Sequence, residues 1–224
     1  QGAKLVGAGI AGTRCGQGQG VAISAAGNTA VLGGPFDNDM LGAAWVFVRS
    51  GGRWVQQGPK LVPSDAVPSI GVEFGYSTAI SDDGNTIVVG GIYDGQGYPG
   101  AAWVFTRSGG VWSQQGPKLV GSHTPDERSQ GWSLAMSADG NTFISGSPQG
   151  AWVFARSGDR WVEQAKLPEP TGTLSWFGAS VALSGDGNTA AVGAAFDDNI
   201  AGSTWVFTRS GTQWTQQGNK LVGT

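Results

Sequence analysis

The chain is poor in the residues that carry most protein chemistry. It has one cysteine, Cys15, and one histidine, His123, among 224 residues. A single cysteine excludes an internal disulfide framework, and we interpret Cys15 as a small loop residue. Nucleophilic catalysis needs a base held beside the nucleophile. Because His123 lies in a polar stretch without a counterpart elsewhere in the chain, we expect it at the surface and predict no enzyme activity and no catalytic residues.

Charge is scarce as well. Charged residues make up 13% of the chain, with a net charge of −3 and no run of one sign. Nucleic-acid binding needs a basic face, and attraction to anionic membranes needs a basic cluster. No apolar run approaches the roughly 20 residues that cross a bilayer. We therefore expect no nucleic-acid partner and no membrane insertion.

Repetition is abundant. The stretch WVFVRSG (45–51) recurs as WVFTRSG (103–109), WVFARSG (152–158) and WVFTRSG (205–211), at intervals of roughly 50 residues, a period typical of repeat architectures. Gly-Asn-Thr and Lys-Leu markers recur with it. We predict one domain over 1–224 with repeats at about 8–62, 63–120, 121–168 and 169–224. Residues 1–7 carry a fifth Lys-Leu and are predicted to form a surplus edge strand.

Each repeat reads as four short strands separated by Gly, Asn, Asp and Ser turns, with no helical period. Four-stranded units of this kind indicate an all-β fold, a β-propeller of four antiparallel blades. Because four is the lower limit for such rings, the alternative is a larger ring completed by a second copy or by further residues. Small residues dominate the first two strands, which we place near the axis. One tryptophan pair per blade falls on the third and fourth strands, where we predict a structural role: Trp45 and Trp54, Trp103 and Trp112, Trp152 and Trp161, Trp205 and Trp214.

The segments FGYSTAISDDGNTIVVGG (74–91) and FGASVALSGDGNTAAVGAA (177–195) resemble the FG-GAP repeat of integrin α-subunit propellers and of secreted bacterial propellers. The resemblance covers the chain four times over, with Gln-Gly in place of Phe-Gly at 17–18 and 130–131. It implies a propeller fold, an extracellular or cell-surface location and a role in binding.

Members of that family often hold calcium between the first two strands. Calcium prefers six to eight oxygen ligands, and the matching turns here, such as SAAGN (24–28) and SGDGN (184–188), are too short and too poor in acids. We predict no metal and no other cofactor, and interpret Asp83, Asp139 and Asp186 as turn-forming residues.

The remaining candidate ligand residues lie in loops. Acidic residues between the second and third strands offer a cation or sugar-hydroxyl site, or serve only the turn, while aromatic faces stack on sugars and partner proteins. The candidates are Asp37, Asp39, Tyr93, Tyr98, Trp132, Trp176, Asp197 and Asp198.

These features favour a non-enzymatic extracellular module for interaction or assembly. The surplus Lys-Leu segment suggests one alternative, a filament subunit linked through its terminal strands, because an open strand edge can pair with another chain. The loop aromatics suggest another, a lectin-like propeller. The expected partners are other copies of the chain or another extracellular protein, with glycans as further candidates.

Overall fold

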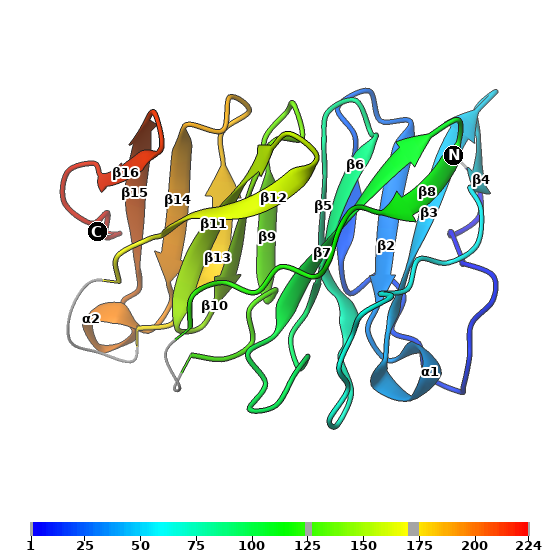
Figure 1. The fold of residues 1–224 in the computed structure, drawn as a ribbon, viewed down its shortest axis with the longest axis horizontal. Coiled ribbons are helices and arrows are strands. Elements are labelled where there is room, and N and C mark those ends of the chain that lie inside the picture. Colours follow the sequence, from blue (N-terminus) through cyan, green and yellow to red (C-terminus); the bar gives the residue numbers. More distant parts are fainter. Residues whose placement is uncertain (1, 124–126, 170–174, 224) are drawn as a thin grey trace.

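The computed structural model describes residues 2–123, 127–169 and 175–223, and it confirms the all-β class (Figure 1). Four separate sheets each contain four antiparallel strands in chain order. The sheets are called blades 1 to 4 below. Blade 1 comprises β1 (Val21–Ile23), β2 (Thr29–Gly34), β3 (Ala43–Ser50) and β4 (Arg53–Gln56); blade 2 comprises β5 (Phe74–Ile80), β6 (Thr86–Gly91), β7 (Ala101–Ser108) and β8 (Val111–Gln114).

The second half of the chain repeats this plan. Blade 3 comprises β9 (Ser133–Met136), β10 (Thr142–Ser147), β11 (Gly150–Ser157) and β12 (Arg160–Lys166); blade 4 comprises β13 (Phe177–Leu183), β14 (Thr189–Ala194), β15 (Ser203–Ser210) and β16 (Gln213–Gln216). The only helical elements described are two single turns, α1 (Asp37–Met40) and α2 (Asp197–Ile200). Their central residues have left-handed backbone angles, which Asn and Asp tolerate.

Local hydrogen bonds explain the turn between the first and second strands. In blade 2 the Ser81 hydroxyl donates to Asp83 at 2.5 Å and accepts from the Thr86 N–H at 3.0 Å, while Asn85 N–H donates to Asp83 at 2.9 Å. Asp139 and Asp186 accept the same bonds in blades 3 and 4. These aspartates hold the tight turn that the sequence predicts.

The glycine of the Phe-Gly pair has a specific task. Gly75 and Gly178 have φ angles of +97° and +103°, and the strand register shifts beside each of them. A side chain on Gly75 would lie 2.5 Å from the carbonyl oxygen of Ala43 in the preceding blade. Positive φ and close backbone approach both favour glycine, so this residue marks where one blade meets the next.

Large aromatic side chains fill the space between blades. Small residues on one blade, such as Val31, Ala44 and Val46, pack against Trp103 and Phe105 of the next. The same arrangement recurs between blades 2 and 3 and between blades 3 and 4. The third-strand tryptophans are almost completely buried, with Trp45, Trp103 and Trp152 at 0% and Trp205 at 4% exposure.

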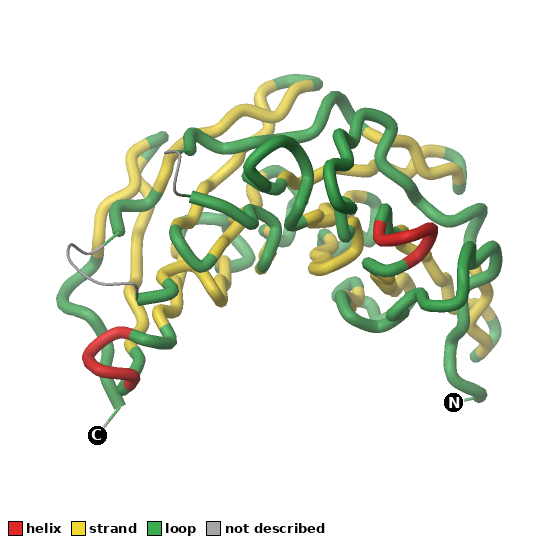
Figure 2. The backbone as a smooth tube through the Cα atoms, turned by 90° about the horizontal axis from the view of Figure 1, so that it is seen from below, coloured by secondary structure: helices red, strands yellow, loops and turns green. Residues whose placement is uncertain are grey.

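The four blades follow an open arch (Figure 2). The first strands of neighbouring blades contact one another, which places them on the inside of the curve. Among the described residues, no strand pairing joins blade 1 to blade 4. The four sheets fit the predicted four propeller blades, but no closed ring is seen among the described residues. Neighbouring blades stay in contact from Gly33 and Gly75 near the inner strands to Gln57 and Trp112 at the outer ones.

The predicted surplus edge strand is not a strand. Residues 2–7 have no regular structure, and Leu5 packs beside Trp45. The place beside β3 is already taken, since Ala44 and Leu61 exchange two backbone hydrogen bonds of 3.0 and 2.7 Å. The first Lys-Leu segment therefore cannot take the place beside β3.

Candidate functional site

A row of four aromatic side chains crosses three blades. Tyr76 lies 4.9 Å from Trp132 between ring centroids, Trp132 lies 6.1 Å from Trp176, and Trp176 lies 4.7 Å from Phe196. We call these residues the aromatic row. The structure thus brings together Trp132 and Trp176, two of the candidates from the sequence, and adds Tyr76 and Phe196 to them.

Strand topology explains why the row forms. Tyr76 and Trp132 both follow the glycine that opens a first strand, so they occupy the same position in blades 2 and 3. Trp176 directly precedes β13, and Phe196 follows β14, which pairs antiparallel with β13. The start of β13 and the end of β14 share one edge of the sheet. Alignment of the repeats could have identified Tyr76, but Phe196 joins the row only through the fold.

The blade 4 end of the row faces solvent. Trp176 is 38% and Phe196 41% exposed, whereas Tyr76 and Trp132 are half-buried. Trp176 adopts a left-handed φ of +57° immediately before the fully buried Phe177. Such a conformation is costly for a bulky residue. Glu73 has the same left-handed φ before the buried Phe74, so this backbone form recurs in the repeat.

A buried carboxyl group lies near the other end of the row. Burial raises the pKa of Glu73, which is 6% exposed. Burial also raises the pKa of the Tyr76 hydroxyl, with smaller contributions from Glu73 and Tyr93. Tyr76 therefore stays a neutral hydrogen-bond donor beside the rings. The row offers apolar faces with one phenol at its blade 2 end.

The acidic loop candidates are engaged by lysines. Asp37 is fully buried, pairs with Lys60 and accepts the Ala11 N–H at 2.7 Å. Asp197 and Asp198 lie 2.7 and 2.6 Å from the ammonium group of Lys220. The lysines belong to the repeated Lys-Leu segments, and Lys118 and Lys166 pair in the same way with Asp94 and Glu127. This recurrence indicates a structural ion pair in each blade.

Asp39, Tyr93 and Tyr98 are not brought into the aromatic row. Asp39 is exposed beside a surface pocket of about 340 Å³ that Arg14 and Phe36 also line. Tyr93 and Tyr98 contact each other edge to face at 5.9 Å. No group of three or more His, Cys, Asp or Glu side chains suited to a metal ion occurs in the described part of the chain. The ligand roles of these residues stay predictions.

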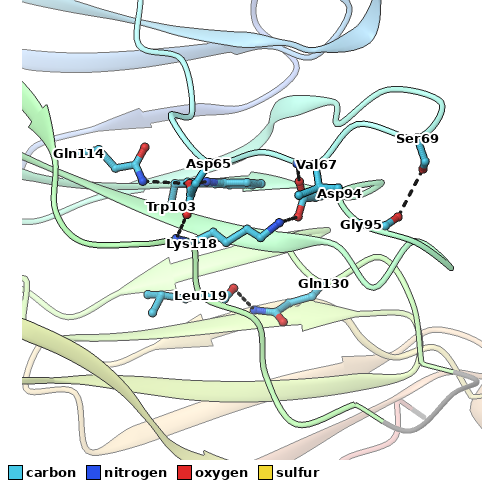
Figure 3. A network of polar contacts seen from close by, with 10 residues as sticks. All are labelled: Asp65, Val67, Ser69, Asp94, Gly95, Trp103, Gln114, Lys118, Leu119 and Gln130. Carbon is cyan, nitrogen blue, oxygen red and sulfur yellow. Dashed lines mark hydrogen bonds and ion pairs between the residues drawn. The ribbon is translucent and has the colours of Figure 1, made fainter.

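A polar network shows how the loop between β4 of blade 1 and β5 of blade 2 is held against blade 2 (Figure 3). Asp65 accepts hydrogen bonds from the Trp103 indole at 2.9 Å, the Gln114 amide at 3.1 Å and the Lys118 backbone N–H at 2.7 Å. Beside it, Asp94 pairs with the Lys118 side chain and accepts the Val67 N–H at 2.6 Å. Every carboxylate of this network has a donor, so the network serves the fold.

His123 differs from the expectation of a surface side chain. It is half-buried, its ring lies 4.5 Å from that of Trp152, and Nε2 is 2.9 Å from Gln130 Oε1. Burial lowers the pKa of the imidazole. The flat face of Trp152 provides packing for the ring, and among the described residues the hydrogen-bond partner of the imidazole is an amide, not a nucleophile. Cys15 is half-buried among Leu5, Trp45 and Leu32, and burial raises the pKa of its thiol.

Four repeated antiparallel sheets stacked around a curve define a propeller-like repeat protein. A family model described as FG-GAP repeat matches residues 54–105 and 161–207. The chain is an FG-GAP-type repeat protein. Both matches run from the fourth strand of one blade to the third strand of the next, so the family's unit spans a junction between blades. The comparison with curated proteins found no match.

Proposed function

We propose that this chain is a non-enzymatic interaction module that binds its partner on the aromatic row. FG-GAP repeats are non-catalytic and typically serve interaction. The observation that carries the proposal is the pair of exposed rings at one end of the row, Trp176 and Phe196, beside half-buried Trp132. Rigid aromatic groups supply large contact areas at low entropic cost.

We also propose an extracellular or cell-surface location. FG-GAP repeats are typical of such proteins, and the low charge and the wealth of Gly, Ser, Thr and Gln suit it. In the described part of the chain, no helix is long and apolar enough to span a membrane.

A matched pair of phenylalanines tests the site. Phe196 in blade 4 and Phe36 in blade 1 follow the second strand at the same repeat position, and they are 41% and 40% exposed. Only Phe196 belongs to the row. We expect Phe196→Ala and Trp176→Ala to reduce partner binding, each by about 1–3 kcal/mol, which is roughly 5- to 150-fold, while Phe36→Ala leaves it unchanged. The partner is first captured with purified chain from extracellular protein, then measured by calorimetry.

Carbohydrate binding is the second candidate, favoured by the succession of ring faces along the row. A glycan array with the native chain and with Trp176→Ala would test it. Glycans retained by the native chain and lost by the variant support this candidate.

Equal binding by Phe36→Ala and Phe196→Ala to any partner would contradict the assignment of the row.

A further inference from the structure

The three junctions between blades share one set of polar contacts. At the inner turns, the Ala25 N–H donates to Asp82 O, Asp82 N–H to Ala138 O, and Ala138 N–H to Gly185 O, at 3.2, 3.0 and 2.8 Å. Each blade thus donates to the next one. At the two ends of this series, the backbone N–H of Gly185 is the donor and the carbonyl of Ala25 is the acceptor that a further junction of the same kind would use.

A glutamine joins the outer strands at every junction. Gln57 of blade 1 accepts hydrogen bonds from Arg107 and Trp112 of blade 2, each at 3.0 Å. Gln115 accepts from Arg156 and Trp161, and Gln164 accepts from Arg209 and Trp214. The arginine in each case also lies over the ring of the tryptophan. One glutamine therefore satisfies two donors of the following blade.

A close backbone approach completes each junction. A Cβ on Gly33, Gly90 or Gly146 would lie 1.9 to 2.2 Å from the carbonyl oxygen of a glycine in the next blade. Beside two of them, Ser77 Oγ donates to Gly131 O at 2.6 Å and Ser133 Oγ donates to Gly178 O at 2.8 Å. Here the glycine backbones of neighbouring blades touch directly, beside the serine hydroxyls.

The outer face of blade 4 keeps this chemistry, and no other blade lies against it in the described part of the chain. We call it the back face; it comprises Ser180, Thr189, Gly193, Thr204 and Gln217. Thr189 and Gln217 are exposed, although the threonines equivalent to Thr189, namely Thr29, Thr86 and Thr142, are buried. The three atoms nearest to a Cβ on Gly193 all belong to Ser180 of its own blade.

The opposite face of blade 1 carries the complementary half. We call it the front face; it comprises Gly18, Val21, Ile23, Arg49 and Trp54. Gly18 has the left-handed φ of Gly75, Gly131 and Gly178, and Arg49 lies 5.7 Å over Trp54. Val21 and Ile23 are 65% and 58% exposed, whereas their counterparts in blades 2 to 4 are half-buried or buried. An apolar hollow of about 420 Å³ lies over β1 and β2 at this face.

We propose that the back face of one copy binds the front face of a second copy, and that two copies close an eight-bladed ring. Val21 and Ile23 leave the front face apolar, as the first strands at the three formed junctions are. The arch of Figure 2 is shaped like a half-ring with both ends open to the same side. A two-fold axis along the curve's centre would form both junctions at once, and eight blades is within the range of known propellers.

The junction has room for only one Lys-Leu segment. The two copies would bring two, QGAKLVG (1–7) and QGNKLVG (217–223), to one place beside β15. Leu221 already holds that place by exchanging hydrogen bonds of 3.0 and 2.9 Å with Thr204. We expect Lys4 and Leu5 of the other copy to be excluded from this place. A chain lacking residues 1–5 should therefore still form the dimer.

Sedimentation and light scattering over a wide range of concentrations test the ring. The expected mass is twice the 22.9 kDa of one chain, without further growth. Gly193→Val and Val21→Lys should weaken the dimer by roughly tenfold or more, the factor that about 1.4 kcal/mol represents. Val111→Lys is the matched control, because Val111 is 69% exposed on the outer strand β8.

The outcomes separate the alternatives. A monomer at every concentration overturns the proposal, and so does open-ended growth, which would instead indicate a filament. Loss of the dimer in Val111→Lys, or an unchanged dimer in both face variants, also overturns it. Circular dichroism checks that each variant is folded. The inference goes beyond the proposed function: partner binding through Phe196 is measured separately, so either can fail alone.

Discussion

Asp65 illustrates how single loop residues hold this molecule together. Its carboxylate accepts hydrogen bonds from three groups of blade 2, including the indole of a fully buried tryptophan, Trp103. Partial burial by itself would raise the pKa of Asp65, but the hydrogen bonds from Lys118, Trp103 and Gln114 outweigh it and lower the pKa. The ionised form is therefore the one that the folded state favours.

This shift predicts a pH dependence. Because the folded pKa lies below the unfolded one, Asp65 stabilises the fold above the ordinary aspartate pKa, and this contribution is lost as the pH falls through the folded pKa. We expect Asp65→Asn to reduce the free energy of unfolding by about 1–2 kcal/mol at neutral pH and by little in strong acid. Urea unfolding at neutral pH and in strong acid measures this loss of free energy. Asp82→Asn, at an exposed position, is the control. An equal loss at both pH values would contradict the assignment.

At the scale of elements, the strands of neighbouring blades approach too closely for a side chain. Gly90 on β6 is the clearest case, since an added Cβ would lie 2.2 Å from the carbonyl oxygen of Gly131. Backbone cannot swing aside as a side chain can. The glycines at these positions are therefore set by the junction rather than by their own strand.

Gly90→Ala should destabilise the fold by about 1–3 kcal/mol, the usual cost of overpacking. Gly185→Ala is the control: its nearest neighbour would be Ala138 Cβ at 3.6 Å, and alanine stands at the same turn position in blades 1 and 3. We expect that variant to be neutral or slightly stabilised. Thermal unfolding of both variants measures the difference. Equal melting temperatures would show that the junction relaxes to accept the methyl group.

For the whole molecule, the absence of a calcium requirement remains a prediction from the short turns between first and second strands. Ser, Asp and Asn side chains in these turns hydrogen-bond to one another and to the backbone. If no ion stabilises the native state, mass action leaves stability independent of calcium. We expect the same melting temperature in calcium and in excess chelator. A fall in chelator would reveal an ion site.

Much of this architecture was predictable because it is local. Strand positions follow from alternating apolar residues, turns from Ser, Asp, Gly and Asn at fixed offsets, and repeat number from the recurring WVF strands. The repeats also show that Tyr76 and Trp132 share a position. The lysine partners of Asp37 and Asp197 were not predictable, since a Lys-Leu segment and an acidic loop of the same blade meet only after the blade has formed.

The sequence by itself determined four antiparallel sheets and the tryptophans between them, because hydrogen bonding within hairpins and burial of alternating side chains act over short stretches of chain. Only the tertiary structure decided that the blades follow an arch and that Trp132, Trp176 and Phe196 meet in one row. Both depend on the angle between blades. That angle arises from packing and backbone contact across whole faces, which no single repeat encodes.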